Sequence, residues 1–137
     1  MTTRTPIYVH FEVPFHDVDR ANIVWHGHYL RYFEFARTAL MRAHRLDVDD
    51  FIDLGLGLVV SESRCRHVSP ARYADVLRIE ARFEAVTHQI VVGYLIVNET
   101  SGKVVARGRT SMVCVNFDLD LLPKVPAEIL DRIGKLP

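Results

Sequence analysis

The chain has 137 residues, of which 49% are apolar, and its 17 basic and 17 acidic side chains cancel. This length predicts one compact domain, residues 1–137, whose core needs neither disulfides nor a structural metal. Zero net charge excludes the broad basic field that attracts nucleic acid. No apolar stretch approaches the roughly 20 residues that span a bilayer. We therefore expect no nucleic-acid partner and no membrane span.

Two further features predict a cytoplasmic location. The N-terminal residues are polar and lack the apolar core of a secretory signal. The two cysteines, Cys65 and Cys114, fit a reducing compartment as unpaired thiols. Isolated cysteines of this kind pack as small apolar side chains more often than they act as ligands or nucleophiles.

The predicted elements begin with a strand, because apolar and polar residues alternate from Ile7 to Phe15. The period then changes, and a wide apolar arc predicts a largely buried helix from Tyr29 to His44. Within that helix Glu34 and Arg37 are spaced to form an ion pair, either as a surface contact of small energy or in a functional role.

Strand patterns follow the helix and fill most of the remaining chain. A short amphipathic piece spans Asp47–Leu54. Predicted strands cover Leu58–Val68, Val76–Val86, Ile90–Val97 and Val104–Val115, with a hairpin turn at Gly102, a loop over Asp118–Pro126 and a terminal helix over Ala127–Ile133.

One apolar helix among strands is best covered by an antiparallel sheet that curls around it. The sequence therefore predicts an α+β fold in which a long central helix is wrapped by a five-stranded antiparallel sheet. A single curled sheet leaves exposed edges, so we expect a homo-oligomer.

The densest group of reactive side chains begins with two acids. If the extended geometry of the first strand continued past Phe15, Asp17 and Asp19 would follow its apolar face into the core. A buried carboxylate needs a partner or a purpose, because removing its water is costly. In the alternative interpretation both acids are exposed turn residues, and Asp19 caps a short helix.

The second half of this group is the start of the long helix, His26-Gly27-His28-Tyr29. Free backbone N–H groups at a helix start stabilise an oxygen that gains negative charge. Gly27 would allow close approach of the backbone. Together with a carboxylate from the preceding loop, these donors form the two halves of an acyl-transfer site. Alternatively, Gly27 only sets the turn and His26 packs.

Other chemistries find less support in the sequence. The histidines and acids between residues 16 and 28 include no spacing that places two imidazoles on one helix face, so we expect no metal. Motifs for a serine nucleophile, a dinucleotide or a phosphate loop are missing as well. We therefore expect no cofactor.

Three runs in the sequence resemble a known family signature: Asp17-Val18-Asp19, Ile23 to Tyr29, and Tyr32-Phe33-Glu34 with Ala36-Arg37. They resemble hotdog-fold acyl-CoA thioesterases of the 4-hydroxybenzoyl-CoA thioesterase type, including the Tol-Pal-associated branch. The segment Pro70 to Asp75 is similar to the loop before the third strand of that family.

The resemblance covers most of the chain and implies a function. It implies hydrolysis of an acyl thioester, carried by coenzyme A or an acyl-carrier protein, to free acid and thiol. The implied active site lies between two subunits of a homodimer or homotetramer.

By position, the resemblance implies that Asp19 is the catalytic carboxylate, acting as nucleophile or general base. It also implies that a backbone N–H of His26 or Gly27 polarises the thioester carbonyl, with Asp17 and Tyr29 in support.

Two positions depart from the family pattern. Phe15 stands where the Tol-Pal-associated branch often has a tyrosine, and Asn22 stands where a glycine is common.

The phosphates of coenzyme A need cationic partners. The candidate arginines are Arg64, Arg66 and Arg72, joined by Arg107 and Arg109 on a later strand. The alternative for each is a solvated sheet face or an oligomer contact.

Two other functions stay open at this point. A hotdog dehydratase would use a catalytic histidine in the sheet and an acid on the central helix, for which Glu34 is the only candidate. A non-catalytic module of the same fold would bind acyl chains or a carrier protein.

Overall fold

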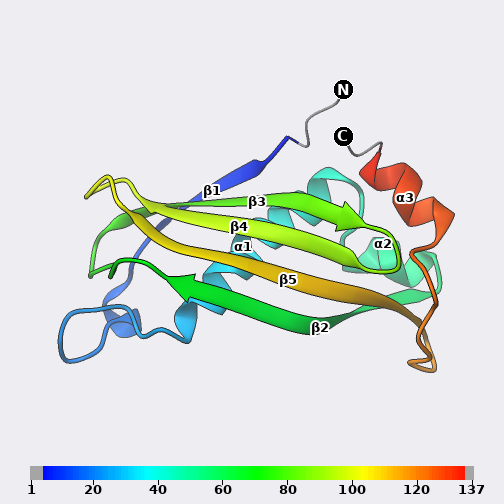
Figure 1. Cartoon of the computed structure of the whole chain (residues 1–137), viewed down its shortest axis with the longest axis horizontal. Helices are drawn as coiled ribbons and strands as arrows, with labels where there is room; N and C mark the ends of the chain where they lie inside the picture. Colours follow the sequence, from blue (N-terminus) through cyan, green and yellow to red (C-terminus); the bar gives the residue numbers. More distant parts are fainter. Residues whose placement is uncertain (1–4, 135–137) are drawn as a thin grey trace.

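The computed structural model describes residues 5–134, which form one sheet packed against one long helix (Figure 1). The elements in chain order are β1 (Ile7–Glu12), a 3-10 turn (Phe15–Asp17), α1 (His28–Ala43), α2 (Val48–Asp53), β2 (Leu56–His67), β3 (Val76–Val86), β4 (Ile90–Asn98), β5 (Val104–Asn116) and α3 (Ala127–Ile133). Among the described residues, no helix has the length and apolar character that crossing a membrane requires. Part of the polar N-terminal segment, residues 1–4, lies outside the described residues.

The sheet has five strands in the order β1-β3-β4-β5-β2, and every neighbouring pair is antiparallel. The hairpin between β4 and β5 turns at Gly102, whose φ of 77° lies in the left-handed region that glycine adopts without strain. The two edges are therefore β1 and β2, and β2 is the longer of them. This confirms the predicted α+β architecture of a central helix covered by a five-stranded antiparallel sheet.

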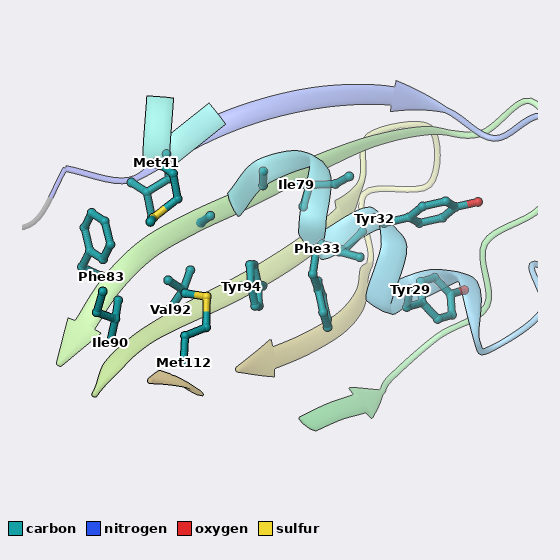
Figure 2. Close-up of a cluster of buried hydrophobic side chains, with 14 of the residues drawn as sticks. Tyr29, Tyr32, Phe33, Met41, Ile79, Phe83, Ile90, Val92, Tyr94 and Met112 are labelled. Atoms are coloured by element: carbon teal, nitrogen blue, oxygen red, sulfur yellow. The ribbon is translucent and has the colours of Figure 1, made fainter. Parts of the chain in front are cut away.

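The core lies between α1 and one face of the sheet (Figure 2). Phe33 of α1 stacks on Tyr94 of β4, with ring centroids 4.5 Å apart and ring planes 8° apart. On β5, a Cβ at Gly108 would overlap the Phe33 ring and approach the backbone oxygen of Arg64. The helix can lie this close to β5 only because position 108 has no side chain.

The end of the first strand differs from its prediction. The strand stops at Glu12, and Pro14 leads into the 3-10 turn. This turn rotates the chain, so Phe15 does not follow Val13 into the core: it is 74% exposed and packs edge-on against Tyr73. The expected inward direction of Phe15 is therefore wrong, because extended geometry does not persist to that residue.

The C-terminal end of α1 is closed by α3. His44 Nδ1 lies 3.1 Å from the backbone oxygen of Arg132, and Arg132 Nη1 donates to the backbone oxygen of Arg45 at 2.8 Å. The His44 ring also packs edge-on against Phe83 of β3. The opposite, N-terminal end of α1 lies beside the end of β2 and the loop before the helix (Figure 1).

Both cysteines are unpaired thiols, as predicted. Cys114 is buried in the core, whereas Cys65 is half-buried on β2. Burial raises the pKa of both thiols.

Candidate active site

Asp17 is the buried acid of the pair, with a side chain that is 1% exposed. Its Oδ2 accepts a hydrogen bond of 2.6 Å from the Tyr32 hydroxyl and another from the Arg31 guanidinium. Its Oδ1 lies 3.5 Å from His16 Nε2 and 3.8 Å from His28 Nε2, and has no hydrogen-bond partner among the described residues. Asp17 therefore ties the loop before α1 to the helix.

Tyr32 is suited to this role by its environment. Burial raises the pKa of Tyr32, and the hydrogen bond to the Asp17 carboxylate raises it further. Tyr32 therefore stays protonated and keeps donating to Asp17. The Arg31 guanidinium lies 5.5 Å from the centre of the Tyr32 ring, which adds a cation–π contact to the cluster.

Asp19 lies on the exposed part of the same loop. Its Oδ1 accepts from the backbone N–H of Ala21 at 2.8 Å and of Ile23 at 3.3 Å. The two acids are thus separated: Asp17 enters the core and Asp19 organises a turn. In this single chain the Asp19 carboxylate faces outward, on the loop that leads to Ile23 and the helix start.

Asn22 shows why this loop tolerates a residue other than glycine. Its φ of 60° lies in the left-handed region, which asparagine visits more readily than most residues. Its side-chain oxygen also accepts a hydrogen bond from the backbone N–H of Tyr73 at 3.2 Å. Asn22 therefore adopts a backbone conformation open to glycine and adds a contact that glycine lacks.

The start of α1 carries free donors. Within the described part of the chain, the backbone N–H groups of His26 and Gly27 donate to no acceptor, whereas that of His28 donates to Trp25 at 3.0 Å. A Cβ at Gly27 would overlap the Trp25 ring, so the indole lies against the glycine backbone. Gly27 is therefore needed for this arrangement of Trp25 and the helix start.

An apolar pocket of about 270 Å³ opens beside these donors. Its lining combines the helix start with the end of β2, and consists of Ile23, Val24, His26, Tyr29, His67, Val68, Ser69 and Pro70. Tyr29 is buried, and burial raises the pKa of its hydroxyl. The structure thus brings His26 and Tyr29 together on one pocket, with Gly27 between them in the chain and Asp19 outside its lining.

His67 was missed by the sequence reasoning. Its ring lies 6.1 Å from that of His26 and 5.4 Å from that of Tyr29, measured between centroids. On β2 it has the same parity as Cys65, which lies opposite Gly108 on the helix-facing side of the sheet. The alternation along β2 was the signal that would have placed His67 on the helix-facing side of the sheet.

The arginines of β2 and β5 form one basic cluster. Arg64 pairs across the strands with Arg109, and Arg66 with Arg107. All four point away from the helix, because Gly108 between them faces it. Arg64 binds Glu62 and Arg109 binds Glu84, but among residues 5–134 no acidic partner contacts Arg66 or Arg107.

Two clefts follow this cluster. The first, of about 410 Å³, is lined by Arg66, His67, Val68 and Arg107, and the second, of about 670 Å³, reaches Arg64 and Arg109. The first cleft shares His67 and Val68 with the apolar pocket. Arg72 is exposed in the loop before β3 and lines none of these cavities.

Glu34 lies away from the pocket. Its carboxylate is 60% exposed and 3.9 Å from Arg37, which confirms the ion-pair spacing. Arg37 in turn donates weakly to the Tyr94 hydroxyl at 3.3 Å and to Thr110 Oγ1 at 3.4 Å, so it ties α1 to the sheet. Residues 5–134 also include no group of three His, Cys, Asp or Glu placed to hold a metal ion.

Known proteins are similar to this chain in sequence and in architecture. The family described as Thioesterase-like superfamily matches residues 13–133. The acyl-CoA thioester hydrolase YbgC of Escherichia coli is 24% identical over 113 residues, covering 82% of this chain and 81% of its own.

Two crystal structures support the fold. A hypothetical protein from Aquifex aeolicus superposes with a TM-score of 0.82 at 26% identity, over 93% of this chain and 98% of its own. A 1,4-dihydroxy-2-naphthoyl-CoA thioesterase from Synechocystis superposes with a TM-score of 0.83 at 21% identity, over 96% and 98%. Because the family match spans nearly the whole described chain, this protein belongs to the Thioesterase-like superfamily and has the hotdog fold that its sequence predicted.

Proposed function

We propose that this protein hydrolyses acyl thioesters, with acyl-coenzyme A as substrate, to a free acid and a thiol. The observation that carries this function is the apolar pocket at the start of α1, beside free backbone N–H groups, in a chain of the Thioesterase-like superfamily. The pocket accepts the acyl group. The thioester oxygen then points to the N–H groups of His26 and Gly27, which stabilise its developing negative charge.

Asp19 is the proposed catalytic carboxylate. It attacks the carbonyl carbon itself or takes a proton from the attacking water. Asp17 holds the loop of Asp19 in place through two hydrogen bonds. Its carboxylate accepts one from the Tyr32 hydroxyl, and its backbone oxygen accepts one from the Trp25 N–H at 3.1 Å. Asp17 and Tyr29 are then supporting residues: Asp17 fixes the loop and Tyr29 forms a wall of the pocket.

A second copy of the chain completes the site in this proposal. β2 offers a free edge of 12 residues with two exposed apolar side chains, Val59 at 42% and Val60 at 45%. Antiparallel pairing of two β2 edges would satisfy their backbone groups and cover these valines. We propose a homodimer on this edge, with a homotetramer as its further association. Light scattering on the wild type and on Val60→Lys measures this: the substitution is expected to release monomers.

The basic cluster on β2 and β5 is the proposed site for the carrier of the acyl group. Arg66 and Arg107 are free of acidic partners among the described residues, and guanidinium groups suit phosphate oxygens. Arg64 and Arg72 are secondary candidates, since Arg64 is engaged by Glu62 and Arg72 lies apart. We also propose a cytoplasmic location, because the unpaired thiols fit a reducing environment.

Thiol release from benzoyl, short-chain and long-chain CoA esters tests the proposed function. We expect release from at least one ester, and a loss of about 100-fold or more in kcat for Asp19→Asn with an unchanged circular dichroism spectrum. Asp53→Asn, an exposed acid of α2, is the matched control. No release from any ester would favour the non-catalytic binding module, and an active Asp19→Asn protein would end the role of Asp19.

A further inference from the structure

Two of the seven histidines differ from the rest in their contacts. Across residues 5–134, the ring nitrogens of His26 and His67 form no hydrogen bond with protein oxygen or nitrogen atoms. The other five each contact one: His10 contacts Glu99, His16 and His28 face Asp17, His44 contacts Arg132 and His88 contacts Thr87. The His26 ring and Nε2 of His67 are therefore free to meet a ligand, whereas Nδ1 of His67 faces the Cys65 sulfur.

His67 occupies the junction of two cavities. It is the last residue of β2, paired with Ala106 of β5, so the sheet fixes its backbone. It lines both the apolar pocket and the cleft that runs to Arg66 and Arg107. Its Nδ1 lies 3.9 Å from Cys65 Sγ, and its Nε2 has no partner within the described chain.

An acyl thioester has two chemically different parts, which match the apolar pocket and the arginine cleft. Its acyl group is apolar, and its carrier bears the pantetheine arm and the phosphates. With the acyl group in the pocket and the carrier directed along the arginine cleft, the sulfur atom that joins them lies at the junction, beside His67. This placement rests on the proposed function.

We propose that His67 is a further catalytic residue, which protonates the departing thiolate. When the carbon–sulfur bond breaks, its electron pair goes to sulfur, and the sulfur takes the proton of a His67 ring N–H. The ring then regains a proton from solvent. Histidine is the usual donor near neutral pH, and a thiolate beside the apolar Val68 would be costly without one.

The test varies the leaving group while the acyl group is kept. The variants are His67→Asn and His67→Gln, with His88→Asn, an exposed histidine of the β3–β4 turn, as control. When the carbon–sulfur bond breaks, coenzyme A leaves more readily if its sulfur is protonated. 4-Nitrothiophenol depends less on such a proton, because its thiolate is stable at neutral pH. We expect kcat/KM to fall about 100-fold for the CoA ester and less than about 3-fold for the nitrothiophenyl ester.

The outcomes separate the two proposals. Equal losses on both esters, or no loss on the CoA ester, would overturn the proton-donor role of His67. A merely structural role would lower both rates together, and two variants that fold with different side-chain shapes guard against a packing effect. A wild-type protein that cleaves neither ester would overturn the proposed function, and the role of His67 with it.

Discussion

The hydroxyl of Tyr32 donates a 2.6 Å hydrogen bond to the carboxylate of Asp17, and both side chains are almost fully buried. Asp17→Ala leaves that hydroxyl and the Arg31 guanidinium without their acceptor. We therefore expect the free energy of unfolding to fall by about 3 kcal/mol, as measured by urea denaturation. Asp17→Asn keeps an acceptor for Tyr32 and is expected to cost less than the alanine substitution.

Tyr32→Phe completes a double-mutant cycle for this pair. It removes the donor but leaves Arg31 bound to the carboxylate, so a loss of about 1 kcal/mol is expected. The double variant should lose less than the sum of the two single variants. Additive losses would show that the two residues are energetically independent.

Alkaline pH is expected to destabilise the fold. Burial raises the pKa of Tyr29, Tyr32 and Tyr94 above the ordinary value of 10.0, and that of both thiols above 9.0. These groups stay protonated in the folded protein at a pH where they ionise in the unfolded chain. The stabilisation is therefore complete below about pH 9 and decreases as the pH rises above it.

Urea unfolding between pH 8 and pH 11 measures this effect. Each such group steepens the decrease by at most about 1.4 kcal/mol per pH unit, so Tyr32→Phe should make the profile shallower. A free energy of unfolding that stays constant to pH 11 would contradict the role of these buried groups.

Gly27→Ala is expected to displace Trp25, because the added methyl group and the indole cannot occupy the same space. Overpacking of this kind costs about 1–3 kcal/mol. The chain has a single tryptophan, so its fluorescence spectrum reports the movement directly. We expect thioester hydrolysis to fall about tenfold as the helix start shifts.

Trp25→Ala provides the internal comparison. Without the indole the added methyl group has room, so Gly27→Ala should lower stability and thioester hydrolysis less in the Trp25→Ala protein than in the wild type. An equal effect in both backgrounds would mean that Trp25 does not set the need for glycine.

Two neighbouring glycines of the sheet should respond differently to the same change. Gly108→Ala forces the methyl group against Phe33 and the backbone of Arg64, and should cost about 1–3 kcal/mol in unfolding free energy. Gly93→Ala meets the flexible end of Glu84, which can move, so a change below about 1 kcal/mol is expected. Equal losses at the two positions would contradict the close approach of α1 to β5.

Arg66→Gln separates recognition of the carrier from recognition of the acyl group. We expect KM for acyl-CoA to rise about tenfold, from the loss of a charge-assisted contact. Hydrolysis of the matching N-acetylcysteamine ester, which has no phosphates, should be unchanged. Arg82→Gln, on the exposed side of β3, is the control. An equal loss of activity on both substrates would show that Arg66 does not act by binding the phosphates.

Periodicity predicted the architecture because most elements present a continuous apolar face to one core. The helix starts one residue before its predicted first residue, and β3 and α3 coincide with their predicted bounds. The first strand was predicted too long, since the turn at Phe15 depends on Pro14 and on the packing of Asp17 rather than on alternation.

The candidate site was predictable where its residues are adjacent in the chain. The helix start and the acids of one loop belong to a single short segment. The pairing of Arg64 and Arg66 with arginines of β5 depends on the register of the two strands. The position of His67 beside His26 depends on how the helix start packs against the end of β2. Asp17 is buried and Asp19 is exposed because the chain turns at residues 15–17, and the alternation of a strand does not predict that turn.

The two ends of α1 have different roles. One end is fastened by His44 and Arg132 to the rest of the molecule, while the other borders the pocket through His26 and Tyr29. The end beside the pocket is held as well, because Arg31 and Tyr32 bind Asp17 of the preceding loop. We therefore expect only pocket-lining side chains outside that cluster to be exchangeable at little cost in stability.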